Sequence, residues 1–311
     1  MRRPLASSLR ILAAALLVAP ALLRAANGAD ATASQSLNLP LEARAAGMGD
    51  AYVAVASGAD GLQWNPAGMN ELRVPQVEAG HLDWIQGVND EYASAAFPIY
   101  GLGAWGVGAS YLYTQDQYFD SVGNPGANFT DFDFSAKAAL AVQLPDSMSV
   151  GIEYKILRQG YGQQFSMGSG FDLGWQMRDV IRSLDLGAAL TDLGTPMAIG
   201  TTRENLPIQM KAGAAAHLTP LLTLAVDEEF QPLDTINLLH GGLEYGTRVG
   251  DWTGLARVGY TYGPAQADGG LTGLAVGLGV ATGSWQLDYA WAPQGDLGQS
   301  NRITLTWNAG E

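Results

Sequence analysis

The sequence predicts an all-β fold, a 14-stranded antiparallel transmembrane β-barrel with a short, partly helical N-terminal hatch in its lumen. Three observations lead to this prediction. A secretory leader opens the chain, a Gly/Ala-rich segment follows at 41–72, and strands with alternating polarity fill the chain from residue 74 onward. The predicted division is a signal peptide at 1–31, the hatch at 32–73 and an outer-membrane barrel at 74–311.

The leader has the three parts of a cleaved export signal. Three arginines precede an apolar run at 11–23, and Ala29-Asp30-Ala31 offers an A-x-A cleavage step. A membrane-anchoring helix is the alternative, but the run is shorter than the roughly 20 residues that a span needs and contains Pro20. We therefore expect the chain to be exported through a cleaved signal peptide.

Composition excludes several classes of function. The chain has no cysteine, which excludes a disulfide framework and thiolate metal sites. The leader holds four Arg and one Asp, so its removal shifts the net charge from −14 to −17, which argues against nucleic-acid binding. Only 15% of residues are charged, while Gly numbers 40, Trp 8 and Tyr 12; this combination is typical of a membrane barrel with interfacial aromatic residues.

Period-two alternation predicts fourteen strands, an even number as single-chain bacterial barrels have. In 284–292, for example, Trp285, Leu287, Tyr289 and Trp291 alternate with polar or small residues. A soluble β-sandwich or a propeller also uses short strands, but the non-apolar faces here are largely Gly, Ala and scattered charge, and no blade repeat is visible. The predicted strands are 74–84, 88–97, 102–114, 130–143, 147–158, 164–177, 182–192, 205–217, 220–230, 236–248, 252–264, 271–282, 284–293 and 300–308.

The connections predict the orientation of the barrel. Barrels of this kind keep short turns on the periplasmic side and longer loops outside. The long polar connections at 114–130 and 193–205 follow the third and seventh strands, which run outward if both termini are periplasmic.

With the apolar face assigned to lipid, the alternation directs a set of charged side chains into the lumen. A charge that faces lipid near the midplane costs about 2–4 kcal/mol for Arg or Lys, so the inward placement is strongly preferred. These residues could form a polar path or hold the hatch, or they could be ion pairs in a solvated lumen, which we favour for any single residue. The predicted lumen-facing charges are Asp131, Asp133, Lys137, Glu153, Lys155, Asp172, Lys211, Asp227, Glu229, Glu244 and Arg257, with His240 beside them.

Catalysis has little support in the sequence. The three histidines, His81, His217 and His240, lie on different predicted strands and lack the i, i+4 spacing of a helical metal site. No nucleophile turn is recognisable, although a hydrolase with Ser and His on neighbouring strands stays open because triads are recognised by geometry. We predict no enzyme activity, no catalytic residue, no metal and no cofactor.

Two motifs carry a resemblance to a known family. The first is the run Ala43 to Ala56 (ARAAGMGDAYVAVA) followed by Gly61 to Gly68 (GLQWNPAG), and the second is Leu287 to Gly298 (LDYAWAPQGDLG) with Asn301 to Leu305. Together they resemble the PorV/PorQ family, within the superfamily of FadL-type long-chain fatty acid transporters. The motifs lie at opposite ends, so the resemblance covers essentially the mature chain.

The resemblance implies an outer-membrane barrel whose Asn-Pro-Ala step, here Asn65, Pro66 and Ala67, belongs to the hatch. It implies a role in protein secretion of the type IX kind, with secretion components or secreted cargo as partners besides outer-membrane lipid. The alternative is FadL-like passive transport of a hydrophobic ligand, and a purely structural role is a third. Because the predicted lumen is Gly-rich and charged, the sequence favours the secretion role over the conduit.

Overall fold

The computed structural model describes residues 32–119, 122–199, 201–263 and 271–310. Within them, fourteen antiparallel strands form a closed barrel in which the first strand pairs with both the second and the last. The predicted fold class is confirmed. None of the described helices is long and apolar enough to cross a membrane. The leader predicted at 1–31 lies outside the described residues.

Each barrel strand corresponds to one predicted segment. The strands are β1 Gln76–Asp83, β2 Asn89–Ile99, β3 Gly103–Phe119, β4 Pro125–Gln143, β5 Met148–Tyr161, β6 Gln164–Met177, β7 Leu184–Gly194, β10 Gln209–Thr219, β11 Leu222–Gln231, β12 Ile236–Val249, β13 Trp252–Tyr262, β14 Leu274–Thr282, β15 Trp285–Pro293 and β16 Gln299–Asn308. Strands β8 Met197–Ile199 and β9 Thr202–Glu204 form a separate two-stranded sheet in the connection before β10.

The two faces of each strand have opposite environments, as alternation requires. On β5 the side chains of Ile152, Tyr154 and Ile156 are 44–47% exposed on the outer wall, while Glu153 and Lys155 between them are at most 3% exposed. An outward apolar face with buried charges is the arrangement that a lipid environment favours.

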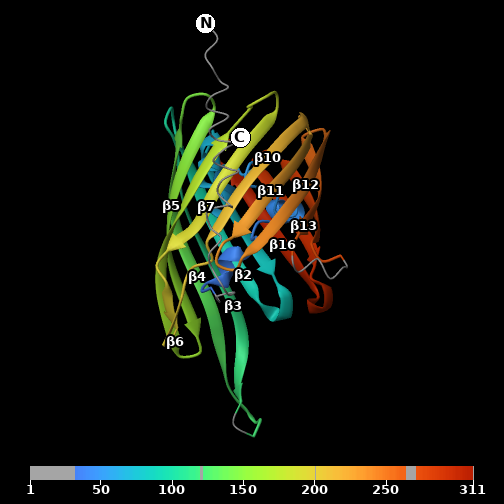
Figure 1. Cartoon of the computed structure of the whole chain (residues 1–311). Coiled ribbons are helices and arrows are strands. Elements are labelled where there is room, and N and C mark those ends of the chain that lie inside the picture. Colours follow the sequence, from blue (N-terminus) through green and yellow to red (C-terminus); the bar gives the residue numbers. More distant parts are fainter. Residues whose placement is uncertain (1–31, 120–121, 200, 264–270, 311) are drawn as a thin grey trace.

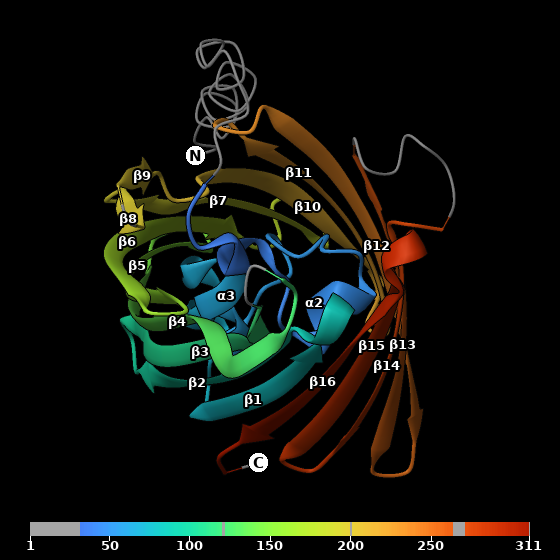
Figure 2. The ribbon, with the colours of Figure 1, turned by 90° about the horizontal axis from the view of Figure 1, so that it is seen from below.

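The hatch occupies the inside of this ring, where Figure 2 shows α2 and α3 surrounded by strands. Its short elements are η1 Gln35–Asn38, α2 Ala43–Gly47, η2 Gly58–Asp60, α3 Gly61–Trp64 and η3 Pro66–Glu71. Helix α2 packs on β13 to β16, and η3 packs on β3 to β6. The hatch therefore contacts two separate parts of the inner barrel wall.

The two ends of the barrel differ. Gln76 at the start of β1 pairs with Asn308 at the end of β16, so both lie at one end, and the turns at that end are short. The hairpin of β3 and β4 projects far beyond the opposite end (Figure 1). Pairing continues there from Thr114 and Asp131 out to Phe119 and Pro125, where the sequence predicted a loop. Residues 115–128 are mostly polar and lack the apolar alternation of the other strands, so the sequence pattern does not reveal these strand ends.

Candidate functional site

The Asn-Pro-Ala step forms a buried corner between α3 and η3. The Asn65 side chain is fully buried, and its Nδ2 donates to the carbonyl oxygens of Val53 at 2.9 Å and Trp175 at 3.1 Å. Its Oδ1 accepts from the Ala67 N–H at 3.2 Å, which caps η3, and Pro66 stands at the first position of that helix. The Asn65 side chain thus bonds two other positions of the hatch, Val53 and Ala67, and also bonds β6.

Two glycines on the wall allow this corner to approach. A Cβ at Gly151 of β5 would lie 2.4 Å from the Ala67 nitrogen, and a Cβ at Gly174 of β6 would lie 2.2 Å from Asn65 Oδ1. Since real Cβ atoms do not come so close, the hatch backbone rests directly on the bare strand backbone. Small inward-facing residues of the wall are therefore required for the close contact between hatch and wall.

Arg44 connects α2 to the wall through a chain of charges. Its guanidinium donates to both carboxylate oxygens of Glu244 at 2.9 Å. Arg257 then donates to Glu244 Oε2 and Asp288 Oδ1, each at 2.6 Å. Bidentate arginine–carboxylate pairs are strong and fix orientation, so this chain holds the hatch against β12, β13 and β15.

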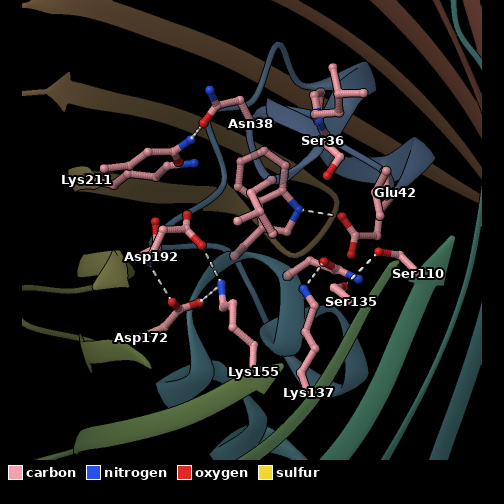
Figure 3. A pocket seen from close by; sticks show the side chains of 18 residues that line it. Ser36, Asn38, Glu42, Ser110, Ser135, Lys137, Lys155, Asp172, Asp192 and Lys211 are labelled. Carbon is pink, nitrogen blue, oxygen red and sulfur yellow. Dashed lines mark hydrogen bonds and ion pairs between the residues drawn. The ribbon is translucent and has the colours of Figure 1, made fainter. Parts of the chain in front are cut away.

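Lys155 is the centre of a buried cluster on β5, β6 and β7. Its Nζ lies 2.8 Å from Asp172 Oδ2, 2.7 Å from Asp192 Oδ1 and 3.9 Å from Glu153 Oε1. Figure 3 shows Lys155 between Asp172 and Asp192 at the edge of a cavity. One buried ammonium thus pairs directly with two aspartates and lies near a third carboxyl group, and a buried charge needs such pairing.

A second group of charges, on β10 and β11, contacts the middle of the hatch. Asp227 Oδ2 accepts from the backbone N–H of Tyr52 at 2.5 Å and of Val53 at 2.6 Å. Lys211 lies 3.1 Å from Glu229 and 4.8 Å from the centre of the Trp64 ring system. These wall residues bind backbone and aromatic groups of the hatch.

Asp131 and Asp133 lie on β4 toward the projecting end. We define residues 32–42 of the hatch as the strap. Asp133 accepts from Ser36 Oγ at 2.5 Å, whereas half-buried Asp131 accepts from the Gly162 N–H at 2.9 Å in the β5–β6 turn. The strap continues to β16, where Arg302 Nε donates to the Pro40 carbonyl at 2.6 Å. Asp133 therefore binds the strap, and Asp131 orders a turn of the wall.

Lys137 differs from the other lysines of the lumen. Its Nζ donates to the Leu62 carbonyl at 3.1 Å and to the Gln63 side-chain oxygen. Within the described residues, no carboxylate oxygen lies within ion-pair distance of this ammonium. Lys137 is thus a buried cation held by hatch oxygens.

Sequence reasoning missed several charged residues of the lumen, among them Asp192, Asp288, Arg302 and Glu42. Arg302 is buried, and alternation could have found it because it lies opposite in phase to Ile303 and Trp307 on β16. Glu42 stands in the irregular hatch, where no period places a side chain. Burial, and next the Asp60 carboxylate, raise the pKa of Glu42 from 4.5 to about 8.

An open cavity lies between the strap, Trp64 and the wall from β3 to β10; we call it the outer cavity, and its empty space of about 550 Å³ includes open solvent. The strap lines it with Leu37, Leu39 and Leu41, and the wall lines it with the lysines and aspartates described above. The lining is thus amphipathic: on the strap side leucines alternate with polar residues, and the wall side is charged.

The wall beside the outer cavity contains a β-bulge at Thr191 and Asp192 of β7. Phe171 pairs with Leu193 and Leu173 pairs with Leu190, so two residues of β7 stand opposite Asp172 of β6. Both bulge residues are buried and line the cavity, and the Asp192 N–H donates to the Asp172 side chain at 2.8 Å. The β6–β7 ladder is therefore interrupted at this point.

The comparisons with known proteins agree with this geometry. The solved structure of the Pseudomonas putida toluene transporter TodX covers 84% of this chain and 95% of its own, with a TM-score of 0.54 and 11% identity. A Pseudomonas aeruginosa FadL homologue covers 87% of this chain and 99% of its own, with a TM-score of 0.56 and 11% identity. No protein-family model matches the sequence, and no curated protein sequence matches it significantly.

The chain has the FadL-type barrel fold. At this identity the likeness concerns the fold alone. The finer resemblance to PorV/PorQ proteins rests on the two sequence motifs and stays a prediction.

Proposed function

We propose that the protein is an outer-membrane FadL-type barrel that lets small, largely apolar molecules pass, with a leader at 1–31, a hatch at 32–73 and a barrel at 74–311. The structural neighbours, a toluene transporter and a FadL homologue, support the conduit. They favour the role that the sequence placed second over the secretion role that it placed first.

The outer cavity carries this proposal. Its apolar side, formed by Leu37, Leu39, Leu41 and Trp64, suits the body of a small apolar molecule. Lys137, which has hatch oxygens rather than a carboxylate beside it, suits an anionic or polar head group. The preferred passenger is therefore amphipathic, with a short apolar body and one polar group.

The exit that we propose is the bulge at Thr191 and Asp192. A passenger in the outer cavity touches this interrupted part of the ladder, and the outer surface next to it is apolar, with Leu173 46% exposed. Separation of β6 and β7 here breaks fewer backbone–backbone hydrogen bonds than along the regular part of this ladder, and it also requires the Lys155 bridge between Asp172 and Asp192 to open.

Uptake measurements test the conduit. Bacterial cells that lack their own hydrophobic-molecule channels would express the full chain, and uptake of radiolabelled decanoate and toluene would be compared with an empty-vector strain. We expect uptake several-fold above the vector level. Deletion of Thr191 brings Asp192 opposite Asp172 and restores the ladder, so uptake should fall to the vector level, while Thr191→Ser keeps the bulge and should retain it. Vector-level uptake of both probes by folded wild-type protein would refute the conduit.

Protein secretion is the second candidate, and the projecting hairpin of β3 and β4 is the observation that favours it (Figure 1). Near its tip Tyr118 is 44% and Val122 79% exposed, which offers contact area to a secretion component or to secreted cargo. Removal of the hairpin tip should then change the profile of secreted proteins and leave decanoate uptake unchanged. An unchanged profile would exclude a docking role for the hairpin.

A further inference from the structure

The lumen contains a second polar space on the other side of the hatch. It has a volume of about 390 Å³, is open to solvent and is lined by Arg44, Asp60, Glu78, Asp288 and the hydroxyls of β16; we call it the inner cavity. Its strand residues lie near the start of β1 and the end of β16, the end of the barrel where both termini of the sheet meet. The inner and outer cavities thus approach the hatch from opposite ends.

Glu42 is the residue that lines both cavities. Its side chain is 1% exposed, and its Oε2 accepts from Trp64 Nε1 at 2.6 Å. Figure 3 shows the carboxylate directed into the outer cavity, across from Ser110 and Lys137. Glu42 is thus shared by the linings of the two spaces, and its side chain has one described hydrogen bond, from Trp64.

The second carboxylate oxygen of Glu42 is an independent sign of a polar occupant. Oε1 is fully buried and has no hydrogen-bond partner within the part of the chain that the structure describes. A buried carboxylate oxygen without a partner is costly, and such groups are normally satisfied by water or an ion. Its position between two polar cavities supplies the space for either.

The charges of the inner cavity favour cations. Arg44 is already paired with Glu244, and Asp288 with Arg257. Among the described ion pairs, none involves Asp60 or Glu78, so these two acidic side chains line the space without a paired cation. A narrow polar space with an excess of one sign of charge concentrates the opposite ion.

We propose that the two cavities form a polar path past the hatch for water and small monovalent cations, and that Glu42 and Trp64 form its gate. In the structure the gate is closed, because the two cavities are separate and Glu42 lies at the edge of both. This path runs along the barrel axis and does not depend on the sideways route proposed for apolar molecules. Either one can fail in experiment without the other.

Conductance of the purified full chain in a planar lipid bilayer, in potassium chloride, tests the gate. Glu42→Ala removes the side chain that lines both cavities, and Trp64→Phe removes its N–H donor while keeping an aromatic ring. We expect at least a tenfold rise in conductance for Glu42→Ala, a smaller rise for Trp64→Phe, and a reversal potential that shows preference for K⁺ over Cl⁻. The control Trp285→Phe changes a tryptophan on the outer wall and should conduct like the wild type.

Thiol labelling gives a second measurement. Because the chain contains no cysteine, only the introduced thiol of this protein can react. Gln286→Cys places a thiol in the inner cavity, whereas Trp285→Cys places it on the neighbouring outward face. Intact cells would receive a cationic trimethylammonium-ethyl or an anionic sulfonatoethyl methanethiosulfonate from outside. We expect Glu42→Ala to accelerate cationic labelling of the Gln286→Cys thiol at least tenfold, with slower anionic labelling and no acceleration at the outward position.

Folding of each variant is checked by its heat-modifiable mobility on gels. The proposal is overturned if folded Glu42→Ala shows wild-type conductance and wild-type labelling. It is also overturned if the open variant prefers Cl⁻ or reacts faster with the anionic reagent.

Discussion

Replacement of Asn65 gives a sharp test of how the hatch is held. Asn65→Ala removes the Nδ2 donor to Val53 and Trp175 and the Oδ1 acceptor for the Ala67 N–H. Asn65→Asp keeps the shape and the helix cap but replaces the donor with a carboxylate oxygen that faces carbonyl oxygens. The two variants therefore separate the cap from the donor bonds.

The magnitude follows from three lost hydrogen bonds at about 1 kcal/mol each, so Asn65→Ala should destabilise the hatch by about 3 kcal/mol. The Val53 carbonyl keeps a bond from Gln176 at 3.0 Å, which limits the penalty for an unpaired acceptor. Asn65→Asp should cost more, because a buried carboxylate against carbonyl oxygens is repelled as well as unpaired. Since every 1.4 kcal/mol is tenfold, Asn65→Ala should reduce protection by about a hundredfold.

Hydrogen–deuterium exchange of amides 61–72, in detergent micelles, is the assay. Protection should fall in this segment and stay unchanged in β11 to β13, because the barrel closes without the hatch corner. Wild-type protection in Asn65→Asp would refute the reasoning, since it would mean that the donor bonds contribute nothing.

Three further predictions concern the wall, the ion cluster and pH. Gly151→Ala should weaken protection of η3, since its Cβ would meet the hatch backbone, whereas Gly241→Ala, where an added Cβ meets nothing within 4 Å, should leave exchange unchanged. Lys155→Met leaves Asp172 and Asp192 without their cation and should lower the free energy of unfolding in urea by about 3–5 kcal/mol; an unchanged urea midpoint would contradict the cluster's role. The pKa of Glu42, about 8, lies above its ordinary 4.5, so the folded state binds one more proton than the unfolded state between these values. Hatch protection should therefore fall as pH rises from about 5 to about 8. Glu42→Gln should flatten this pH dependence, and an equal slope in both proteins would contradict the prediction.

The number of strands and the inward or outward direction of their side chains could be predicted from the sequence. A strand that separates lipid from a lumen must alternate, so Ile152 and Tyr154 mark the outside and Glu153 and Lys155 the inside without any knowledge of neighbours. Where this alternation is absent, the sequence does not predict the strands: it predicts a loop where β3 and β4 extend, and it does not predict β8 and β9. Glu42 was missed for the same reason, because an irregular hatch has no period.

The sequence by itself determined the strand number and the face on which the predicted strand charges lie, because these follow from the local pattern of polarity along each strand. Only the tertiary structure decided the partners. Lys155 meets Asp192 because β7 bulges, and Asn65 contacts β6 because wall glycines leave room for it. Glu42 lines two cavities because the fold places the strap beside Trp64 inside the barrel. Such contacts join residues up to hundreds of positions apart, and their geometry is set by barrel closure and register, which no single segment encodes.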